Sequence, residues 1–489
     1  MIVLLSIISI FLAFCFRAST FLDPDFGWHI RMGEIISRAG IPTRDPFSYT
    51  MPSFPFISHE WLVDVLLKNL YESLGMTGLS LIFTTIAFLA LYPALRGGDG
   101  RRTFWEVSLV LGFGIIFPYF GVRPQVVTWL FWAIFLTLVL SQKVWDKWRF
   151  FLPFFFVVWV NLHASFAIGI VSLALIGIFS FWEKRKRRVD LILVFLLSTL
   201  ATFINPYGPR IWYEVWLSIS DTSLRWSILE WQPAFFSVNL ALIFYLVVSV
   251  FLIWRSRKRY GIYELSLYFF FLLQGLASTR HIPLWVILSI PMTIRAFGFL
   301  LASVKGIAFG EKRFKLVYKW TLYLSVVIAL LQSFIILGAA NSMDEEGFYP
   351  KGAVLFLKQN LPQGEIFSVY GWGGYLIWKL PEKKVFIDGR MPSWRYGENP
   401  TSESSYAMRD YTDVLNGRIP YQEIFEKYGV SVVLWPKDKP LKFFDTLSQK
   451  LEQVLFKKGE PFNLVKELEK DGWQKVYEDQ VAVIYQHPQ

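Results

Sequence analysis

The chain contains very little cysteine and histidine for its length. It has one Cys and five His among 489 residues, and Cys15 lies inside the first apolar run. A lone cysteine forms no disulfide within the chain and no Cys-rich zinc site, so cysteine chemistry is excluded. The sequence also lacks a Walker loop after a predicted strand and a Gly-x-Ser-x-Gly turn. These absences argue against the common soluble nucleotidases and hydrolases.

Charged residues are scarce as well, because apolar residues dominate the composition. Hydrophobic residues make up 54% and aromatic residues 18%, against 18% charged residues. This composition is far from that of a soluble domain and predicts a multi-pass α-helical membrane protein. About eleven apolar runs are long enough to cross a bilayer of roughly 30 Å. They lie at 2–20, 74–96, 104–120, 125–142, 149–162, 165–182, 188–204, 238–254, 262–279, 281–303 and 316–338.

The loops between these runs differ in charge. Nineteen Lys and Arg, against four Asp and Glu, gather in five alternate loops, at 96–102, 143–149, 183–188, 255–259 and 305–315. Since short cytoplasmic loops collect cations, we predict an integral cytoplasmic (inner) membrane protein with a cytoplasmic N-terminus. The first run lacks a basic n-region and a cleavage site, so we expect a retained anchor. The basic balance then reflects topology and anionic lipid, and no nucleic-acid partner is expected.

Polar motifs fall on the opposite, extracytoplasmic side. They are DPDFGWHIR (23–31), RDPFSYT (44–50), SHEW (58–61), GVRP (121–124), NLHAS (161–165), NPYG (205–208), EWQP (230–233) and STRH (278–281). Four of the five histidines belong to these motifs, namely His29, His59, His163 and His281. Titratable and amide groups that converge on one face are typical of an active site that opens outward.

The composition also divides the chain into two domains. We predict a transmembrane domain at 1–338 with a large first external loop at 21–73, and an extracytoplasmic α/β domain at 339–489. Its expected strands are 365–370, 384–388, 430–435, 473–479 and 481–486, and its expected helices are 350–360, 402–416, 420–428 and 441–457. GWGGYLIW (371–378) and DGR (388–390) follow the first two strands, and ligands or partners of open α/β sheets meet strand ends.

The first external loop resembles that of the type C glycosyltransferases, membrane enzymes that use lipid-phosphate sugars. The residues at the spacing of the archaeal oligosaccharyltransferase catalytic subunit are Asp25, Trp28, His29, Ile30 and Arg31. A following stretch extends the similarity through Gly40, Pro42, Asp45 and Pro46. The plan of many spans followed by an external α/β domain is similar too. A closer likeness is to uncharacterised prokaryotic membrane proteins with D-x-D-x-x-W-H-[IL]-R, SHEW-like and WGGYLIW…DGR segments.

This resemblance implies a glycosyltransferase that moves a sugar or glycan from a polyprenyl-phosphate donor, with inversion. The acceptor would be an extracytoplasmic glycan, lipid or protein, and membrane lipids are further partners. Gly-Trp-Gly-Gly-Tyr at 371–375 stands where the oligosaccharyltransferases have Trp-Trp-Asp-Tyr-Gly, their acceptor-peptide element. Because the aspartate is absent here, recognition of a peptide sequon does not carry over.

Such a transfer needs a base for the acceptor. Asp25 is our first choice because it occupies the position of the family's first-loop aspartate, and Asp23 is its partner. His29 and Glu60 complete the catalytic candidates. The carboxylates could instead hold Mg²⁺ or Mn²⁺, since both cations prefer oxygen ligands. The candidate metal ligands are Asp23, Asp25, Glu60 and Glu230.

The leaving phosphate and the sugars need other side chains. Guanidinium groups pair well with phosphate, and three external arginines are candidates, namely Arg31, Arg123 and Arg280. Candidate acceptor or sugar contacts are aromatic or polar residues of the external motifs, namely Trp28, His59, His163, Trp372, Tyr375, Asp388 and Arg390. The tryptophans could equally anchor the chain at the bilayer interface.

Structural roles remain open for every candidate. Asp23 and Asp25 could form a turn or a helix cap after the first span, although a cap needs only one aspartate. His29 could be a satisfied interfacial histidine, and His59 with Glu60 could cap the next helix. The external arginines could reach to lipid headgroups. WGGYLIW could pack the soluble domain, and DGR could be a strand-ending turn.

Two other functions remain as alternatives. A transporter or flippase for a lipid-linked or polar solute would usually place charged or broken segments in mid-membrane. This chain gathers its polar groups at one surface, which favours the enzyme. A non-catalytic envelope assembly protein is the third possibility, and it predicts that Asp25 can be replaced without loss.

Overall fold

The computed structural model describes residues 2–92, 105–180, 188–221, 228–236, 239–304, 311–340, 344–397, 402–437 and 462–488. The chain forms two compact units. We call Met1–Asp23 with Ile57–Asn341 the membrane unit, and Pro24–Phe56 with Ser342–Gln489 the α/β unit. Most of the first external loop therefore belongs to the α/β unit, whereas we had grouped it with the spans. The predicted helix at 441–457 and much of the basic loops lie outside the described residues.

Each predicted span contains a helix in its described residues. These helices are α1 (Ile2–Thr20), α3 (Trp61–Leu91), α5 (Trp105–Ile116), α6 (Pro124–Leu140), α8 (Leu152–Leu162), α9 (Phe166–Ser180), α10 (Arg188–Ala201), α13 (Leu240–Ser256), α14 (Ile262–Ala277), α15 (Ile282–Val304) and α16 (Glu311–Ala340). Two further helices of this unit are α7 (Gln142–Trp148) and α11 (Arg210–Ser220). The long apolar runs were thus a reliable guide to helix positions.

The number of membrane crossings is a separate question. Among the described residues, four helices are long and apolar enough to span a bilayer, at Trp61–Leu91, Leu240–Arg259, Thr279–Leu300 and Tyr318–Gly338. A fifth span results if Pro124–Leu140 and Gln142–Leu162, which bend by 98° at their junction, count as one. Five other apolar helices are shorter. About eleven crossings therefore stays a prediction.

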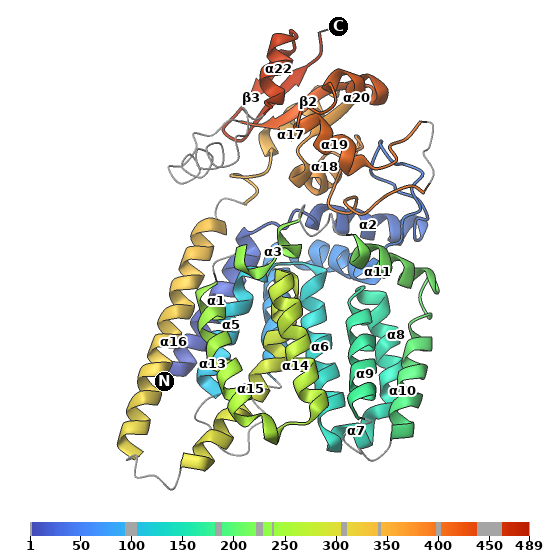
Figure 1. Ribbon diagram of the computed structural model, residues 1–489. Coiled ribbons are helices and arrows are strands. Elements are labelled where there is room, and N and C mark those ends of the chain that lie inside the picture. Colours follow the sequence, from blue (N-terminus) through green and yellow to red (C-terminus); the bar gives the residue numbers. More distant parts are fainter. Residues whose placement is uncertain are drawn as a thin grey trace. The chain divides into compact units, whose positions relative to one another are not determined.

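The membrane unit is a bundle of helices with large aromatic side chains inside. α15 packs against α5, α13 and α14, while α3 packs against α1 and α6 (Figure 1). Fully buried indole rings fill this core, at Trp129, Trp132, Trp159 and Trp285. The Trp132 indole donates a hydrogen bond of 2.9 Å to the carbonyl of Leu284, which joins α6 to α15. Burying aromatic area in this way dominates core energetics.

The α/β unit contains a four-stranded mixed sheet. Its strands are β1 (Glu365–Ser368), β2 (Val430–Pro436), β3 (Gln474–Glu478) and β4 (Ala482–Gln486), in the order β1-β2-β4-β3. β1 runs parallel to β2, whereas β4 is antiparallel to both neighbours. Its helices are α2 (Phe26–Ala39), α17 (Lys351–Gln359), α18 (Gly373–Lys379), α19 (Ala407–Leu415), α20 (Tyr421–Tyr428) and α22 (Leu464–Lys470). The predicted α/β class is confirmed, although α2, α18 and α22 were not expected.

One predicted strand was wrong. Residues 384–388 form no strand of the sheet, and Val385 makes only an isolated parallel bridge with Ser48. The Val385 amide donates to the carbonyl of Phe47 at 3.0 Å, and the Tyr49 amide donates to the carbonyl of Val385 at 3.1 Å. The apolar pattern of 384–388 therefore marks burial against the first external loop. Pairing partners more than 300 residues apart give no local signal in a sequence.

Candidate functional site

An arginine held between two carboxylates forms the centre of a polar cluster in the membrane unit. Arg123 Nε lies 3.1 Å from Asp23 Oδ2, and Arg123 Nη1 pairs with Glu230 Oε1. We call these three residues the Arg123 cluster. Asp23 follows α1, Arg123 directly precedes α6, and Glu230 lies in the short 3-10 helix η3 (Leu229–Trp231). Three of the predicted external motifs thus meet at one place.

Local sequence explains how Arg123 is presented. Pro124 occupies the first position of α6, and proline disfavours helical backbone in the residue before it. Arg123 accordingly has an extended backbone with φ −150° and ψ 146°. Its side chain leaves the helix end instead of following the helix surface. The sequence Arg-Pro at a helix start therefore aims the guanidinium at Asp23 and Glu230.

The fourth motif, STRH, joins the cluster through backbone contacts. The hydroxyls of Ser278 and Thr279 donate to the carbonyl of Glu230 at 3.1 and 3.0 Å. The amide of Thr279 also donates to the carbonyl of Gln232 at 3.0 Å. Gln125 Nε2 donates to the carbonyl of Arg280 at 3.3 Å. The segments that carry Arg280 and Glu230 are therefore fixed against each other and against α6.

A pocket of about 220 Å³ opens beside the Arg123 cluster. Three arginines line it, together with Glu230 and uncharged residues of the same loops, and they are Arg17, Arg123 and Arg280. The Arg280 guanidinium lies 5.4 Å from the centre of the Trp231 ring, which orients it by a cation–π contact. Among the described residues, Arg280 makes no ion pair within 4 Å, so its charge is available to a ligand.

Arg17 was missed in the sequence because it lies within the first apolar run. Its Nε donates to the carbonyl of Phe120 at 2.8 Å, and its Nη2 donates to the carbonyl of Pro118 at 3.0 Å. Arg17 also lies over the Phe21 ring at 4.7 Å. A cation in the last turn of an apolar helix is expensive unless it has such partners. That position was the signal that could have identified it.

Charge in the pocket is unequal. Arg17, Arg123 and Arg280 carry three positive charges, and Asp23 and Glu230 carry two negative ones. Burial alone would raise the pKa of Glu230, but the neighbouring Arg123 and Arg280 outweigh it and lower that pKa below 4.5. Glu230 is therefore ionised at neutral pH. One positive charge remains in excess, which suits an anion.

A second polar cluster of the membrane unit joins the SHEW and NLHAS motifs. His163 Nε2 lies 2.9 Å from Glu60 Oε1, and His59 Nε2 lies 3.7 Å from the same oxygen. His163 Nδ1 lies 2.7 Å from the hydroxyl of Ser165. The indole of Trp61 donates to Asn161 Oδ1 at 2.9 Å. Glu60 and His163 are thus buried and paired with each other. The catalytic role of Glu60 and the acceptor or sugar contacts of His59 and His163 remain predictions.

In the α/β unit, the DPDFGWHIR and GWGGYLIW motifs pack closely. α2 and α18 lie against each other, and both contain glycine at the contact. A Cβ atom at Gly374 would lie 2.1 Å from the carbonyl oxygen of Pro24. A Cβ atom at Gly27 would lie 2.1 Å from the carbonyl oxygen of Gly374. Only a hydrogen atom fits at these two positions, so the glycines allow the backbones of the two motifs to pack directly against each other.

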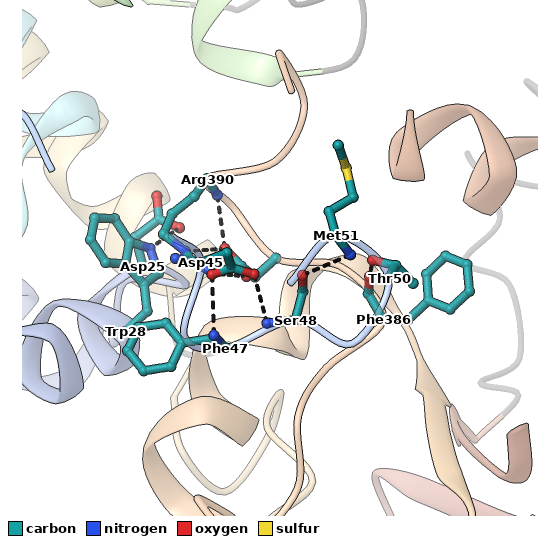
Figure 2. A network of polar contacts seen from close by, with 10 residues as sticks. Asp25, Trp28, Asp45, Phe47, Ser48, Thr50, Met51, Phe386 and Arg390 are labelled. Atoms are coloured by element: carbon teal, nitrogen blue, oxygen red, sulfur yellow. Dashed lines mark hydrogen bonds and ion pairs between the residues drawn. The ribbon is translucent and has the colours of Figure 1, made fainter. Parts of the chain in front are cut away.

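A second arginine between two carboxylates lies in this unit. Arg390 Nη2 lies 2.6 Å from Asp388 Oδ2 and 2.9 Å from Asp45 Oδ1, and Arg390 Nε donates to Asp388 Oδ1 at 2.8 Å. We call these three residues the Arg390 cluster. Figure 2 labels its Arg390 and Asp45, together with neighbouring residues. Asp45 also accepts from the amides of Phe47 and Ser48, at 3.1 and 2.7 Å.

The Arg390 cluster is sealed from solvent. Its three side chains are 0 to 3% exposed, and the rings around the guanidinium are those of Trp28, Phe47, Phe56 and Trp394. Burial would lower the pKa of Arg390, but Asp388 and Asp45 raise it further, so the guanidinium stays charged. Asp388 and Arg390 therefore hold the unit together, and their predicted acceptor contact has no support in this position.

The other predicted residues of this unit make mostly internal contacts. Trp28 Nε1 donates to Asp25 Oδ1 at 3.0 Å, and the Trp28 ring lies on His29 with 3.6 Å between centroids. Arg31 pairs with Glu34 in α2. The indole of Trp372 donates to the carbonyl of Phe348 at 2.9 Å, and the Tyr375 hydroxyl donates to Glu345 Oε1 at 3.0 Å. Asp25 is half-buried, so its carboxylate is more accessible than those of the Arg390 cluster.

The three predicted metal ligands of the membrane unit, Asp23, Glu60 and Glu230, do not form one group. Glu60 contacts histidines, while Asp23 and Glu230 contact Arg123. Among the described residues there is no group of three or more His, Cys, Asp or Glu side chains arranged for a metal ion. A cation next to the carboxylates disfavours a second cation there. These three carboxylates therefore do not fit Mg²⁺ or Mn²⁺ as a set, and we derive no step through a metal.

Comparison with known proteins gives a likeness in structure. No protein-family model matches the sequence, and no curated protein matches it. ArnT from Cupriavidus metallidurans, solved with undecaprenyl phosphate bound, aligns over 100% of this chain and 98% of its own, with 13% identity and a TM-score of 0.50. An Archaeoglobus fulgidus oligosaccharyltransferase tethered to an acceptor peptide with an NVT sequon aligns over 88% of this chain and 69% of its own, with 10% identity and a TM-score of 0.54.

A second structure of that oligosaccharyltransferase, in complex with Zn and sulfate, aligns over 85% of this chain and 64% of its own. The identity is 11% and the TM-score 0.51. At such identities the likeness concerns the fold alone. The chain therefore has the fold of the type C membrane glycosyltransferases, as the resemblance of its first external loop predicted.

Proposed function

We propose that this chain is an integral membrane glycosyltransferase that moves a sugar or glycan from a polyprenyl-phosphate donor to an extracytoplasmic acceptor, with inversion at the anomeric carbon. The pocket of the membrane unit lined by Arg17, Arg123 and Arg280 is the observation that carries the proposal. A structural relative, ArnT, was solved with undecaprenyl phosphate bound, which is the lipid-phosphate part of the class of donor we propose here.

The donor's phosphate would bind in this pocket. Phosphate oxygens pair with guanidinium groups through charge-assisted hydrogen bonds, and the pocket has one positive charge in excess. Arg280 offers its guanidinium fully, while Arg123 is shared with Asp23 and Glu230. Because lipid phosphates lie at the bilayer surface, a site at the ends of membrane helices suits them. Of our three predicted phosphate ligands, Arg123 and Arg280 line the pocket, whereas Arg31 belongs to the α/β unit.

Asp25 is the proposed base. It follows Asp23 of the Arg123 cluster by two residues, so chain connectivity alone keeps the two Cα atoms within about 7 Å of each other. Asp25 would take the proton from the acceptor hydroxyl or amide while the acceptor atom forms a bond to the anomeric carbon. The bond from that carbon to the phosphate oxygen breaks, and its electron pair leaves with the polyprenyl phosphate, whose charge the arginines stabilise.

The rest of the proposal concerns topology and the acceptor. The cationic loops favour a cytoplasmic N-terminus, which puts the α/β unit and the acceptor outside. An external glycan, lipid or protein would then be glycosylated. His29, Glu60, His59 and His163 remain candidates for acid–base or acceptor roles, and so do Trp28, Trp372 and Tyr375 for sugar contact.

The test is donor consumption by the purified full chain in proteoliposomes, with radiolabelled polyprenyl-phosphate and polyprenyl-diphosphate sugars. We expect the wild type to consume a donor and Asp25→Asn to lose at least about 10²-fold in rate, the usual range for removing a general base. Glu382→Gln, which alters an exposed carboxylate of the α/β unit, is the matched control and should keep full rate. A parallel arm with EDTA measures metal dependence directly.

Several outcomes would contradict the proposal. An Asp25→Asn variant with wild-type rate would exclude Asp25 as the base and favour a non-catalytic assembly protein. Donor that binds in a filter assay and crosses the bilayer unchanged would favour the transporter or flippase. Binding is therefore measured alongside consumption, so that an unsuitable donor panel is recognised as such.

A further inference from the structure

The carboxylate of Asp25 lies against a glycine of a distant motif. A Cβ atom at Gly389 would lie 1.9 Å from Asp25 Oδ1, so a side chain at position 389 would force the Asp25 carboxylate to move. Gly389 is the central residue of the DGR turn, between Asp388 and Arg390. The absence of a side chain at 389 is thus what allows the Asp25 carboxylate to occupy its position. Both residues belong to the α/β unit.

The same carboxylate oxygen has a second contact, on a rigid aromatic ring. Trp28 Nε1 donates to Asp25 Oδ1 at 3.0 Å, from the first turn of α2. Trp28 is 7% exposed, so packing fixes the position of its ring. The Arg390 guanidinium carbon lies 5.9 Å from the centre of that ring. Trp28 therefore links Asp25 to the Arg390 cluster, as Figure 2 shows.

The Arg390 cluster explains why the turn at Gly389 is held in place. The residues on either side of Gly389 bond to each other, since the backbone amide and Nε of Arg390 both donate to Asp388 Oδ1, at 3.0 and 2.8 Å. Arg390 also reaches Asp45, whose carboxylate is bonded to the amides of Phe47 and Ser48. The two bonds from Arg390 Nε and Nη2 to the two oxygens of Asp388 fix the relative geometry of these side chains. Two ends of one short turn are thus clamped to the first external loop.

We propose that Gly389 and Trp28 are positioning residues for Asp25, and that the Arg390 cluster holds Gly389 where the Asp25 carboxylate needs open space. The inference rests on the proposed function, in which Asp25 is the base. It gives Trp28 and the three residues of the DGR turn a shared role that their separate motifs do not suggest. A base displaced by about 1 Å can lose about 10²-fold in rate.

The experiment compares Gly389→Ala with Gly397→Ala in the donor-consumption assay. A Cβ atom at Gly397 would meet nothing within 4 Å, so this glycine lies in the same segment without the contact. We expect Gly389→Ala to lower kcat by about 10²-fold with the KM for the donor unchanged, because donor phosphate binds in the membrane unit. Gly397→Ala should retain wild-type kcat and KM.

A double-mutant cycle separates positioning from general damage. In an Asp25→Asn background, Gly389→Ala should cause no further loss, since the base it positions is already gone. Trp28→Phe keeps most of the ring and removes the indole N–H, and should lower kcat by about 10-fold even if Gly389→Ala does not fold. Wild-type kcat in both Gly389→Ala and Trp28→Phe, or equal losses with and without the Asp25 carboxylate, would overturn the inference.

A structure of the Gly389→Ala full chain separates this inference from the proposed function. We expect the Asp25 carboxylate to have moved and its bond to Trp28 Nε1 to have opened from 3.0 Å. If the wild type consumes no donor although donor binds, the proposed function fails, and this structure still decides whether Gly389 positions Asp25. If the wild type is active and the carboxylate has not moved in Gly389→Ala, the inference alone fails.

Discussion

Two clusters among the described residues have the same arrangement of charges but different surroundings. In each, one arginine lies between two carboxylates: Arg123 between Asp23 and Glu230, and Arg390 between Asp45 and Asp388. The Arg123 cluster borders a pocket of about 220 Å³, and its Arg123 and Glu230 side chains are 18% and 30% exposed. The Arg390 cluster is 0 to 3% exposed and surrounded by aromatic rings.

The difference lies in what remains unpaired. Around Arg123, two further arginines line the pocket, so cationic charge is left for a ligand. In the Arg390 cluster, one arginine pairs with two carboxylates that solvent does not reach, so these ion pairs stabilise the α/β unit. The motifs GVRP and DGR look equally functional in a sequence. Solvent access and surplus charge cannot be read from a motif, and they are the reasons why we propose ligand binding for the first cluster and a structural role for the second.

The largest effect should come from removing the sealed cation. Arg390→Gln leaves Asp45 and Asp388 buried without a counter-charge, and breaking a buried ion pair from one side costs about 3 to 5 kcal/mol. We expect early unfolding of the α/β unit and proteolytic cleavage within Pro24–Phe56. Thermal unfolding in detergent, followed by circular dichroism and limited proteolysis, measures both.

Arg418→Gln is the matched control for that change. Arg418 pairs with Asp413 in the same unit, but its side chain is 69% exposed, and exposed pairs contribute about 0 to 1 kcal/mol. A similar loss of stability in the two variants would show that the Arg390 cluster is no more structural than a surface pair.

The next largest effect should come from the open cluster, and on binding instead of folding. Arg123→Gln leaves Asp23 and Glu230 next to the pocket and removes its excess of positive charge, so we expect the donor Kd to rise about 10²-fold. Donor binding to the reconstituted chain measures it. Arg257→Gln is the control, since Arg257 stacks on Trp254 away from the pocket. A loss of stability as large as in Arg390→Gln, with unchanged donor Kd, would remove the distinction between the clusters.

A smaller effect is expected from Arg280, which contributes charge without holding the cluster together. Losing one charge-assisted hydrogen bond of about 1.5 kcal/mol should raise the donor Kd about 10-fold in Arg280→Gln. Arg280→Lys keeps the charge and loses the planar fork, so it should recover only part of the affinity. Binding isotherms of the two variants decide whether charge or geometry matters. Unchanged affinity in both would place the phosphate elsewhere.

The smallest effect concerns pH. Because Arg123 and Arg280 lower the pKa of Glu230 below 4.5, its carboxylate stays ionised at higher pH and its pairing with Arg123 is lost only as the pH falls through that lowered pKa. Between pH 5 and 8 we expect Glu230→Gln to bind donor a few-fold more tightly than the wild type, with a parallel pH dependence. A binding transition in this range that disappears in Glu230→Gln would contradict the assignment.

The sequence predicted the elements well and their long-range partners poorly. Apolar runs located the helices because burial in a bilayer or a core demands continuous apolar length. Alternation located four strands of the sheet. It misread 384–388, since the partner of Val385 is Ser48, more than 300 residues earlier. We predicted that the first external loop belongs to the domain of the spans, because it follows the first span in the sequence. In the structure, most of this loop packs in one unit with Ser342–Gln489.

For the candidate site, residue types were predicted better than their roles. Charge and position singled out Asp23, Arg123, Glu230 and Arg280, which do meet in the membrane unit. Arg17 was missed because the first apolar run was interpreted only as a membrane span, without regard to the single cation in its last turn. The sequence showed the glycines of WGGYLIW and DGR. A glycine that is needed because another segment packs closely against it does not reveal which segment that is.

The split origin of the α/β unit has a consequence for synthesis. Asp45 leaves the ribosome 345 residues before Arg390, a delay of roughly 15 to 70 s at ordinary translation rates. Until then its carboxylate lacks the cation that will enclose it, and α2 lacks α18. The segment Pro24–Phe56 therefore stays incompletely packed while most helices of the membrane unit are synthesised. A fragment that holds only one of the two segments, Pro24–Phe56 or Ser342–Gln489, lacks part of this unit, so its assembly requires both.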